Sequence, residues 1–149
     1  MILKPFFGKL YARWLAQKNR WWINNPIKSQ ERVFRALISS ASETAFGKDH
    51  YFKHIHSYED FKLRVPIRDY EDIKKYIDEI KKGIKNILWP GKPKYLAKTS
   101  GTTSGVKHIP ITNESIPNHI LSSRNALLFY IYETGDTSFL NGKTIFLQG

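Results

Sequence analysis

A run of hydroxyl and glycine residues between positions 99 and 107 has the composition of an anion-binding loop. It reads Thr-Ser-Gly-Thr-Thr-Ser-Gly-Val-Lys, with two glycines four positions apart. Glycine lets a backbone turn tightly and point its N–H groups inward, hydroxyl groups donate hydrogen bonds, and a lysine adds positive charge. The spacing departs from the Walker A loop, because Val106 separates Gly105 from Lys107 and His108 stands where that loop has Ser or Thr. The alternative is a solvated turn between two strands.

Other side chains that could do chemistry are less well arranged. His50, His54 and His56 lie close together in the sequence, without a nearby cysteine or an H-E-x-x-H frame, so we expect no metal site there. The chain has no cysteine, which excludes disulfides, cysteine-based metal centres and thiol catalysis. No Ser-His-Asp constellation can be argued from the sequence.

The full string from Thr99 to Pro110 resembles the phosphate-binding signature S-G-T-T-x-G-x-x-K of adenylate-forming ligases. More narrowly, it resembles the Gretchen Hagen 3 (auxin-responsive promoter) family of acyl acid–amido synthetases, in which a proline closely follows the lysine. The strings Thr44-Ala-Phe-Gly47 and Phe61-Lys-Leu-Arg-Val-Pro66 stand in the same order as in that family. The resemblance covers the chain from about residue 30.

The resemblance implies an activity. In the family, this loop grips the β- and γ-phosphates of Mg·ATP while a carboxylate attacks the α-phosphate, and an amine such as an amino acid then takes the acyl group. Carried over by position, Lys107 would supply charge, and ATP and Mg²⁺ would be the cofactors. The implied phosphate ligands are Ser100, Gly101, Thr102, Thr103, Ser104 and Gly105.

Arg124 is a weaker candidate for binding the substrate. It is the only arginine in the helix expected after the second strand, where members of the family place an arginine for the substrate carboxylate. Its spacing from Lys107 does not match that position without a gap. The alternative is a solvated or ion-paired arginine.

Helices are expected to position the loop from its N-terminal side. Apolar spacing predicts a helix over residues 30–45 that stops at Gly47, a short helix starting at Ser57, and a helix from the N-cap Asp69 to Gly83. The last of these has a predicted buried face of Ile73, Tyr76, Ile77 and Ile80. A further helix in residues 1–25 is expected to dock through the stripe Leu3, Phe6, Phe7, Leu10 and Trp14.

Strands are expected later in the chain. Tyr95–Ala97 is predicted as a short buried strand, Lys107–Thr112 as a second strand with an edge position at Pro110, Ser115–Tyr132 as a long helix, and Thr144–Leu147 as another strand. The expected class is α/β, with N-terminal helices followed by the beginning of the large sheet of an adenylate-forming ligase.

We therefore expect residues 1–149 to be the N-terminal part of a large adenylation domain that is inactive by itself. Its expected parts are a basic aromatic helix at 1–25, a helical region at 26–90, and a strand-loop-strand-helix-strand segment at 91–149. The partners would be a small carboxylic acid, an amine or amino acid, and the remainder of its own polypeptide.

Composition leaves two alternatives open. Hydrophobic residues make up 41% of the chain and aromatic residues 14%, which excludes intrinsic disorder. The net charge is +11, and residues 1–35 carry eight basic side chains against one acid. A basic module that binds anionic lipid or nucleic acid through residues 1–25 is one alternative, although no RNA-binding signature supports it. A ligase that transfers to coenzyme A, similar to phenylacetate-CoA ligases, is the other.

The expected compartment is the cytoplasm. The lack of cysteine fits a reducing compartment, and no apolar run approaches the length of a membrane span or of a secretory signal core.

Overall fold

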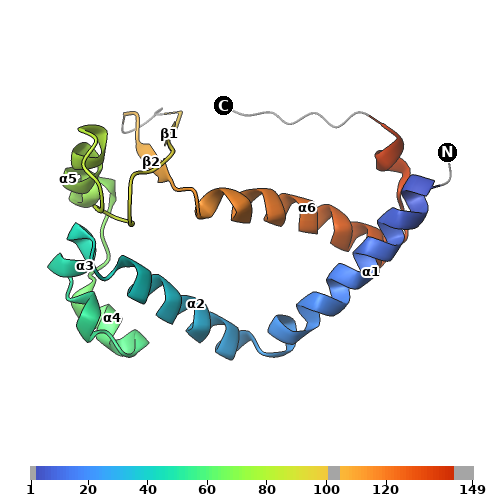
Figure 1. The fold of residues 1–149 in the computed structure, drawn as a ribbon, viewed down its shortest axis with the longest axis horizontal. Coiled ribbons are helices and arrows are strands. Elements are labelled where there is room, and N and C mark those ends of the chain that lie inside the picture. Colours follow the sequence, from blue (N-terminus) through green and yellow to red (C-terminus); the bar gives the residue numbers. More distant parts are fainter. Residues whose placement is uncertain (1–2, 101–104, 143–149) are drawn as a thin grey trace. The chain divides into compact units, whose positions relative to one another are not determined.

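The computed structural model describes residues 3–100 and 105–142, and these fall into two compact units. The terminal unit comprises residues 1–28 and 117–149, and the central unit comprises residues 29–116. The described chain is mostly helical with one small antiparallel sheet, in the expected order of helices first and strands later (Figure 1). The strand expected at 144–147 lies outside the described residues.

The elements follow one another along the chain as α1 (Leu3–Asn24), α2 (Pro26–Ala41), α3 (Ala45–Asp49), the 3₁₀ turn η1 (Phe52–His54), α4 (Tyr58–Arg64), α5 (Tyr70–Lys81), β1 (Tyr95–Lys98), β2 (His108–Ile111), α6 (Ser115–Thr134) and the 3₁₀ turn η2 (Ser138–Asn141). Within these described elements, none is both long and apolar enough to cross a membrane.

The helix predicted to run from residue 30 to Gly47 is in fact two helices. Helix α2 ends at Ala41, and Thr44 starts α3 by accepting the N–H of Gly47 on its side-chain oxygen at 3.0 Å. Thr44 also donates its hydroxyl to the carbonyl of Ala41 at 2.7 Å, which binds the end of α2 to the start of α3. Glycine is needed at position 47 for α3 to approach the end of α2, because a Cβ atom there would lie 2.0 Å from the Ala41 carbonyl oxygen. The predicted stop residue is therefore an interior residue of the next helix.

Both predicted acidic helix starts are confirmed as capping boxes. Ser57 accepts the N–H of Asp60 at 3.1 Å, and the Asp60 carboxylate accepts the N–H of Ser57 at 3.0 Å. Asp69 and Asp72 make the same reciprocal pair at the start of α5. Each pair satisfies N–H groups that a helix start leaves without intrahelical partners, so both starts are determined locally.

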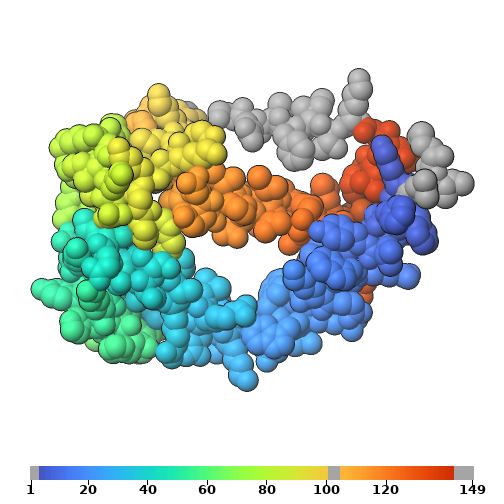
Figure 2. Space-filling view, viewed as in Figure 1, coloured from blue at the N-terminus to red at the C-terminus, as the bar shows by residue number. Residues whose placement is uncertain are grey.

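Helix α5 carries the largest part of the central core. Tyr76, Ile77 and Ile80 are buried as predicted, Ile73 is half-buried, and the chain leaves the helix through Gly83 at φ +86°. These side chains form a cluster with Ile87, and a second cluster joins Ile38, Ala41, Phe52 and Ile55. Phe46 packs against both clusters. Helices α3, α4 and α5 therefore share one continuous packed body (Figure 2).

Strands β1 and β2 form an antiparallel hairpin with the register Tyr95↔Ile111 and Lys98↔His108. The prediction that β1 is buried is wrong, because Tyr95 is 59% exposed and only Leu96 is half-buried. Each strand of a two-stranded ribbon is an edge strand, which is where a proline such as Pro110 is tolerated, as predicted. Helix α6 begins directly after the hairpin, with Pro117 in its first turn as expected.

In the terminal unit, the predicted stripe on α1 is not the packing face within the described chain. Phe6, Phe7, Leu10 and Trp14 are each more than half exposed, whereas Ala12 and Leu15 are buried against Leu128 and Ile131 of α6. The packed face of α1 has small residues, since a Cβ atom on Gly8 would lie 3.0 Å from the Leu140 side chain. Because α1 packs closely against α6 and η2, its packed face accommodates small residues rather than the larger aromatic ones.

We expect the substitution Gly47→Ala to destabilise the central unit by about 2 kcal/mol, because the added methyl group meets backbone rather than a movable side chain. Urea unfolding followed by circular dichroism measures this loss. Gly142→Ala is the matched control, since its Cβ atom would make only ordinary contact at 3.7 Å. Equal stability of the two variants would contradict the tight α2–α3 contact.

The capping box of α4 should make this helix sensitive to acid. The N–H groups of His56 and Ser57 and the Ser57 hydroxyl hold the pKa of Asp60 below its ordinary value. The unfolded chain therefore binds a proton at Asp60 more tightly than the folded chain does. The stabilisation that ionised Asp60 gives to α4 is present above about pH 4 and is lost as the pH falls through the folded-state pKa of Asp60. The protection factors of the α4 amides, which correct for the intrinsic pH dependence of amide exchange, should fall over that range and lose this dependence in Asp60→Asn. Glu59→Gln, which removes a neighbouring surface charge, should retain it.

Candidate functional site

The loop predicted to bind phosphate is closed at its base by two hydrogen bonds between Thr99 and Lys107. The N–H of Thr99 donates to the Lys107 carbonyl at 3.0 Å, and the N–H of Lys107 donates to the Thr99 hydroxyl oxygen at 3.2 Å. These bonds continue the hairpin by one position beyond the pair Lys98↔His108. The two ends of the candidate segment therefore meet at one point.

Three of the predicted phosphate ligands are described by the structure. Ser100 is exposed, Lys107 is half-buried, and Gly105 is exposed with φ +78° and no atom within 4 Å of a Cβ position. This left-handed conformation disfavours any residue with a side chain, so glycine is required by the backbone at position 105. The predicted ligands Gly101, Thr102, Thr103 and Ser104 lie outside the described residues.

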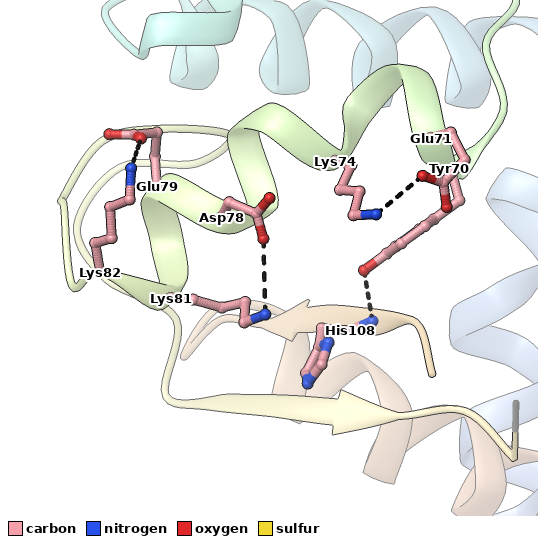
Figure 3. A network of polar contacts seen from close by, with 8 residues as sticks. All are labelled: Tyr70, Glu71, Lys74, Asp78, Glu79, Lys81, Lys82 and His108. Carbon is pink, nitrogen blue, oxygen red and sulfur yellow. Dashed lines mark hydrogen bonds and ion pairs between the residues drawn. The ribbon is translucent and has the colours of Figure 1, made fainter. Parts of the chain in front are cut away.

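Tyr70 is a site residue that the sequence analysis missed. As the first residue of α5, it accepts the N–H of His108 on its phenolic oxygen at 2.8 Å (Figure 3). The Lys107 ammonium lies 5.6 Å from the centre of the same ring. Tyr70 thus contacts both residues that follow the loop, across 38 positions of sequence. The capping box predicts where Tyr70 stands on α5, but no local pattern predicts its partner.

The basic groups near the hairpin differ in their partners. Lys74 and Lys81 of α5, and Lys82 directly after it, pair with Glu71, Asp78 and Glu79 (Figure 3). The N···O distances of these pairs are 2.7–3.6 Å. The hydrogen bonds to these glutamates raise the pKa of Lys74 and Lys82. Among the ion pairs of residues 3–100 and 105–142, none includes Lys107, whose ammonium forms a cation–π pair with the Tyr70 ring. Lys107 is therefore available to an anion.

The other candidates have structural contacts. Arg124 is exposed on α6, where its guanidinium lies 5.6 Å from the Tyr11 ring centre and donates to the Asn125 side chain at 3.1 Å. His50 is buried and bonds through Nδ1 to the Phe46 carbonyl, whereas His54 and His56 are exposed. Over the described part of the chain, no group of three His, Cys, Asp or Glu side chains is arranged to hold a metal ion.

Comparison with known proteins identifies the family to which this hairpin and these helices belong. Residues 19–146 match the GH3 family N-terminal domain. The chain belongs to the GH3 family. It is also 35% identical, over 109 residues, to the indole-3-acetic acid-amido synthetase GH3.15 of Arabidopsis thaliana. That alignment covers 71% of this chain and 18% of the relative. The family expected from the loop is thereby confirmed, and the chain spans a small part of that relative's length.

Tyr70→Phe should release the end of the GH3 hairpin without disturbing its charge. The variant removes the oxygen that accepts the His108 N–H but keeps the ring beneath Lys107. We expect amide exchange at His108 to accelerate about fivefold, the factor that corresponds to one ordinary hydrogen bond. Tyr95→Phe serves as the control, because its exposed ring lies on the same hairpin. An unchanged rate at His108 in Tyr70→Phe would show that this bond does not hold the strand.

Proposed function

We propose that this chain holds the phosphates of ATP in an acid–amido ligase that adenylates a carboxylic acid and passes the acyl group to an amine. The observation that carries the proposal is the hairpin loop of a GH3 family member, closed at Thr99 and Lys107, where Lys107 forms no ion pair with any residue that the structure describes. The relative's name, an amido synthetase for indole-3-acetic acid, supports an acid and an amine as the two substrates.

The residues present fit a polyphosphate. No acidic side chain occurs between Thr99 and Lys107, so nothing in the loop repels an anion. Gly105 lets its backbone approach a bound group because it has no side chain, and Ser100, which is exposed, carries a hydroxyl that can donate a hydrogen bond. Mg²⁺ would enter bound to the phosphates of the nucleotide, as is usual for this ion at sites that bind nucleotides.

The proposed reaction has two steps. The substrate carboxylate attacks the α-phosphorus of ATP, the bond to the β-phosphate oxygen breaks, and pyrophosphate leaves with the negative charge that develops. An amine then attacks the acyl carbon and releases AMP. The loop would act in the first step: N–H and O–H donors of residues 100–105 and the Lys107 ammonium would stabilise the departing pyrophosphate, where preorganised donors have the greatest effect.

The remaining parts of the proposal concern the whole protein. We propose that the 149 residues are the N-terminal part of a large adenylation domain, that they are inactive without the remainder of the polypeptide, and that the protein acts in the cytoplasm. The match to the GH3 family N-terminal domain, together with the alignment to 18% of the relative's length, supports the first of these statements. Arg124 is proposed only as a secondary contact for the substrate carboxylate.

ATP–pyrophosphate exchange by the gene product isolated from its source tests the proposal. With a panel of carboxylic acids, we expect exchange that depends on one or a few of them. Thr102→Val and Lys107→Ala should each lower the exchange rate about tenfold or more, because each removes one donor to the departing pyrophosphate.

Lys94→Ala is the matched control for charge. Lys94 is an exposed lysine at the opposite end of the same hairpin, so its loss should leave the exchange rate unchanged. Full exchange in both loop variants would refute the assignment of the loop. Transfer of the acyl group to coenzyme A but to no amine would favour the thioester-forming alternative.

A further inference from the structure

The central unit has a second group of cationic side chains, separate from the hairpin loop. These side chains line an open pocket of about 520 Å³ between α3, the turn that follows it, the segment before α5, and α5 itself. The lining residues are Lys48, Asp49, His50, Tyr51, Arg68, Lys75 and Tyr76. Three cations and one carboxylate give this lining a net charge of +2.

Two buried polar side chains build the pocket wall. His50 and Tyr76 are each only 5% exposed, and both line the pocket. The His50 Nδ1 atom lies 2.8 Å from the Phe46 carbonyl, and since a carbonyl only accepts, Nδ1 carries the hydrogen. In the neutral ring, the lone pair of Nε2 is then left for Arg68, whose Nη2 lies 3.4 Å away. A fixed imidazole therefore orients the guanidinium.

Tyr76 restrains the single carboxylate. Its hydroxyl donates to Asp49 at 2.6 Å, and burial, together with this bond, raises the pKa of Tyr76 to about 12. The hydroxyl thus remains a donor over the ordinary pH range. Among the described residues, the Asp49 carboxylate forms no ion pair with the pocket's cations.

Two of the three pocket cations form no ion pair with any residue that the structure describes. Among the described residues, Arg68 and Lys75 take part in no ion pair, and Lys75 lies over the Tyr76 ring at 4.7 Å. Lys48 is 3.9 Å from Glu43, but Glu43 is bound more closely by Lys53, whose hydrogen bond lowers the pKa of that glutamate. The segment also contains Tyr51 in a left-handed conformation at φ 55°, which disfavours a tyrosine and is typical of sites that need a particular backbone path.

We propose that this pocket binds a phosphate group. An arginine held by a buried side chain presents two parallel N–H donors that match two oxygens of one phosphate, and the lysines add compact charge beside it. The net lining charge of +2 complements a phosphate dianion better than a carboxylate with a single charge. Inorganic phosphate and a phosphate ester share this chemistry. The site is separate from the proposed ATP loop and does not depend on the proposed function.

Titration of the isotope-labelled chain with inorganic phosphate, at constant ionic strength kept with chloride, tests the proposal by NMR. We expect the amides of His50, Arg68 and Tyr76 to shift with one common dissociation constant. Arg68→Gln and Lys75→Gln should each weaken that binding about tenfold, the factor that corresponds to one charge-assisted hydrogen bond.

Lys74→Gln is the matched control, because Lys74 lies next to Lys75 on the same helix but pairs with Glu71 outside the pocket. It should leave the dissociation constant unchanged. Equal weakening in Lys74→Gln and Arg68→Gln would overturn the proposal, since it would reveal general attraction to a basic chain. Acetate that binds as tightly as phosphate would overturn the assignment to phosphate.

The amides of Gly105, Val106 and Lys107 report the loop in the same spectra. Lys107→Ala should leave the response at His50 intact, and a joint loss at both places would overturn the proposal of a separate site. A parallel titration with glycerol phosphate identifies the source: tighter binding than that of inorganic phosphate would mean an esterified ligand, and weaker binding would mean the free ion. Absence of binding in both titrations would reject the site.

Discussion

Burial of one face of α5 is the constraint on which the central unit depends. Ile77 is 1% exposed, and its neighbours on that face close the core shared with α3 and the segment around Ile87. The capping box at Asp69 determines where this helix begins, so it also determines which residue stands first. That residue is Tyr70, which holds β2, while Tyr76 further along holds Asp49 of α3. One helix thus positions both the hairpin and the cationic pocket.

The hairpin needs this external support. An isolated two-stranded ribbon is marginally stable in water, and β1 and β2 pair over only four positions. Hydrogen bonds at Thr99 and Lys107 close the base of the loop, and the Tyr70 hydroxyl attaches the strand that follows it to a buried helix. A loop that must arrange several donors around a phosphate gains from such an anchor, because each displacement of its base moves every donor together.

Part of the chain's positive charge is neutralised locally by ion pairs. Several lysines of α5 are paired with carboxylates three positions away, and such exposed pairs contribute little to stability. Among the residues that the structure describes, Lys107 beside the loop and Arg68 and Lys75 in the pocket belong to the basic side chains that form no ion pair. The positions of these basic groups therefore indicate more about possible ligands than the net charge of +11 does.

The sequence by itself determined the features that are satisfied within a few residues. Both capping boxes, the buried face of α5, the two strands and the composition of the loop follow from spacing and residue type, and the loop also led to the GH3 family. Only the tertiary structure decided the contact of Tyr70 with His108, the role of Gly47 inside α3, and the face by which α1 packs. Each of these depends on a partner outside the local turn or helix, and periodicity along one segment carries no information about that partner.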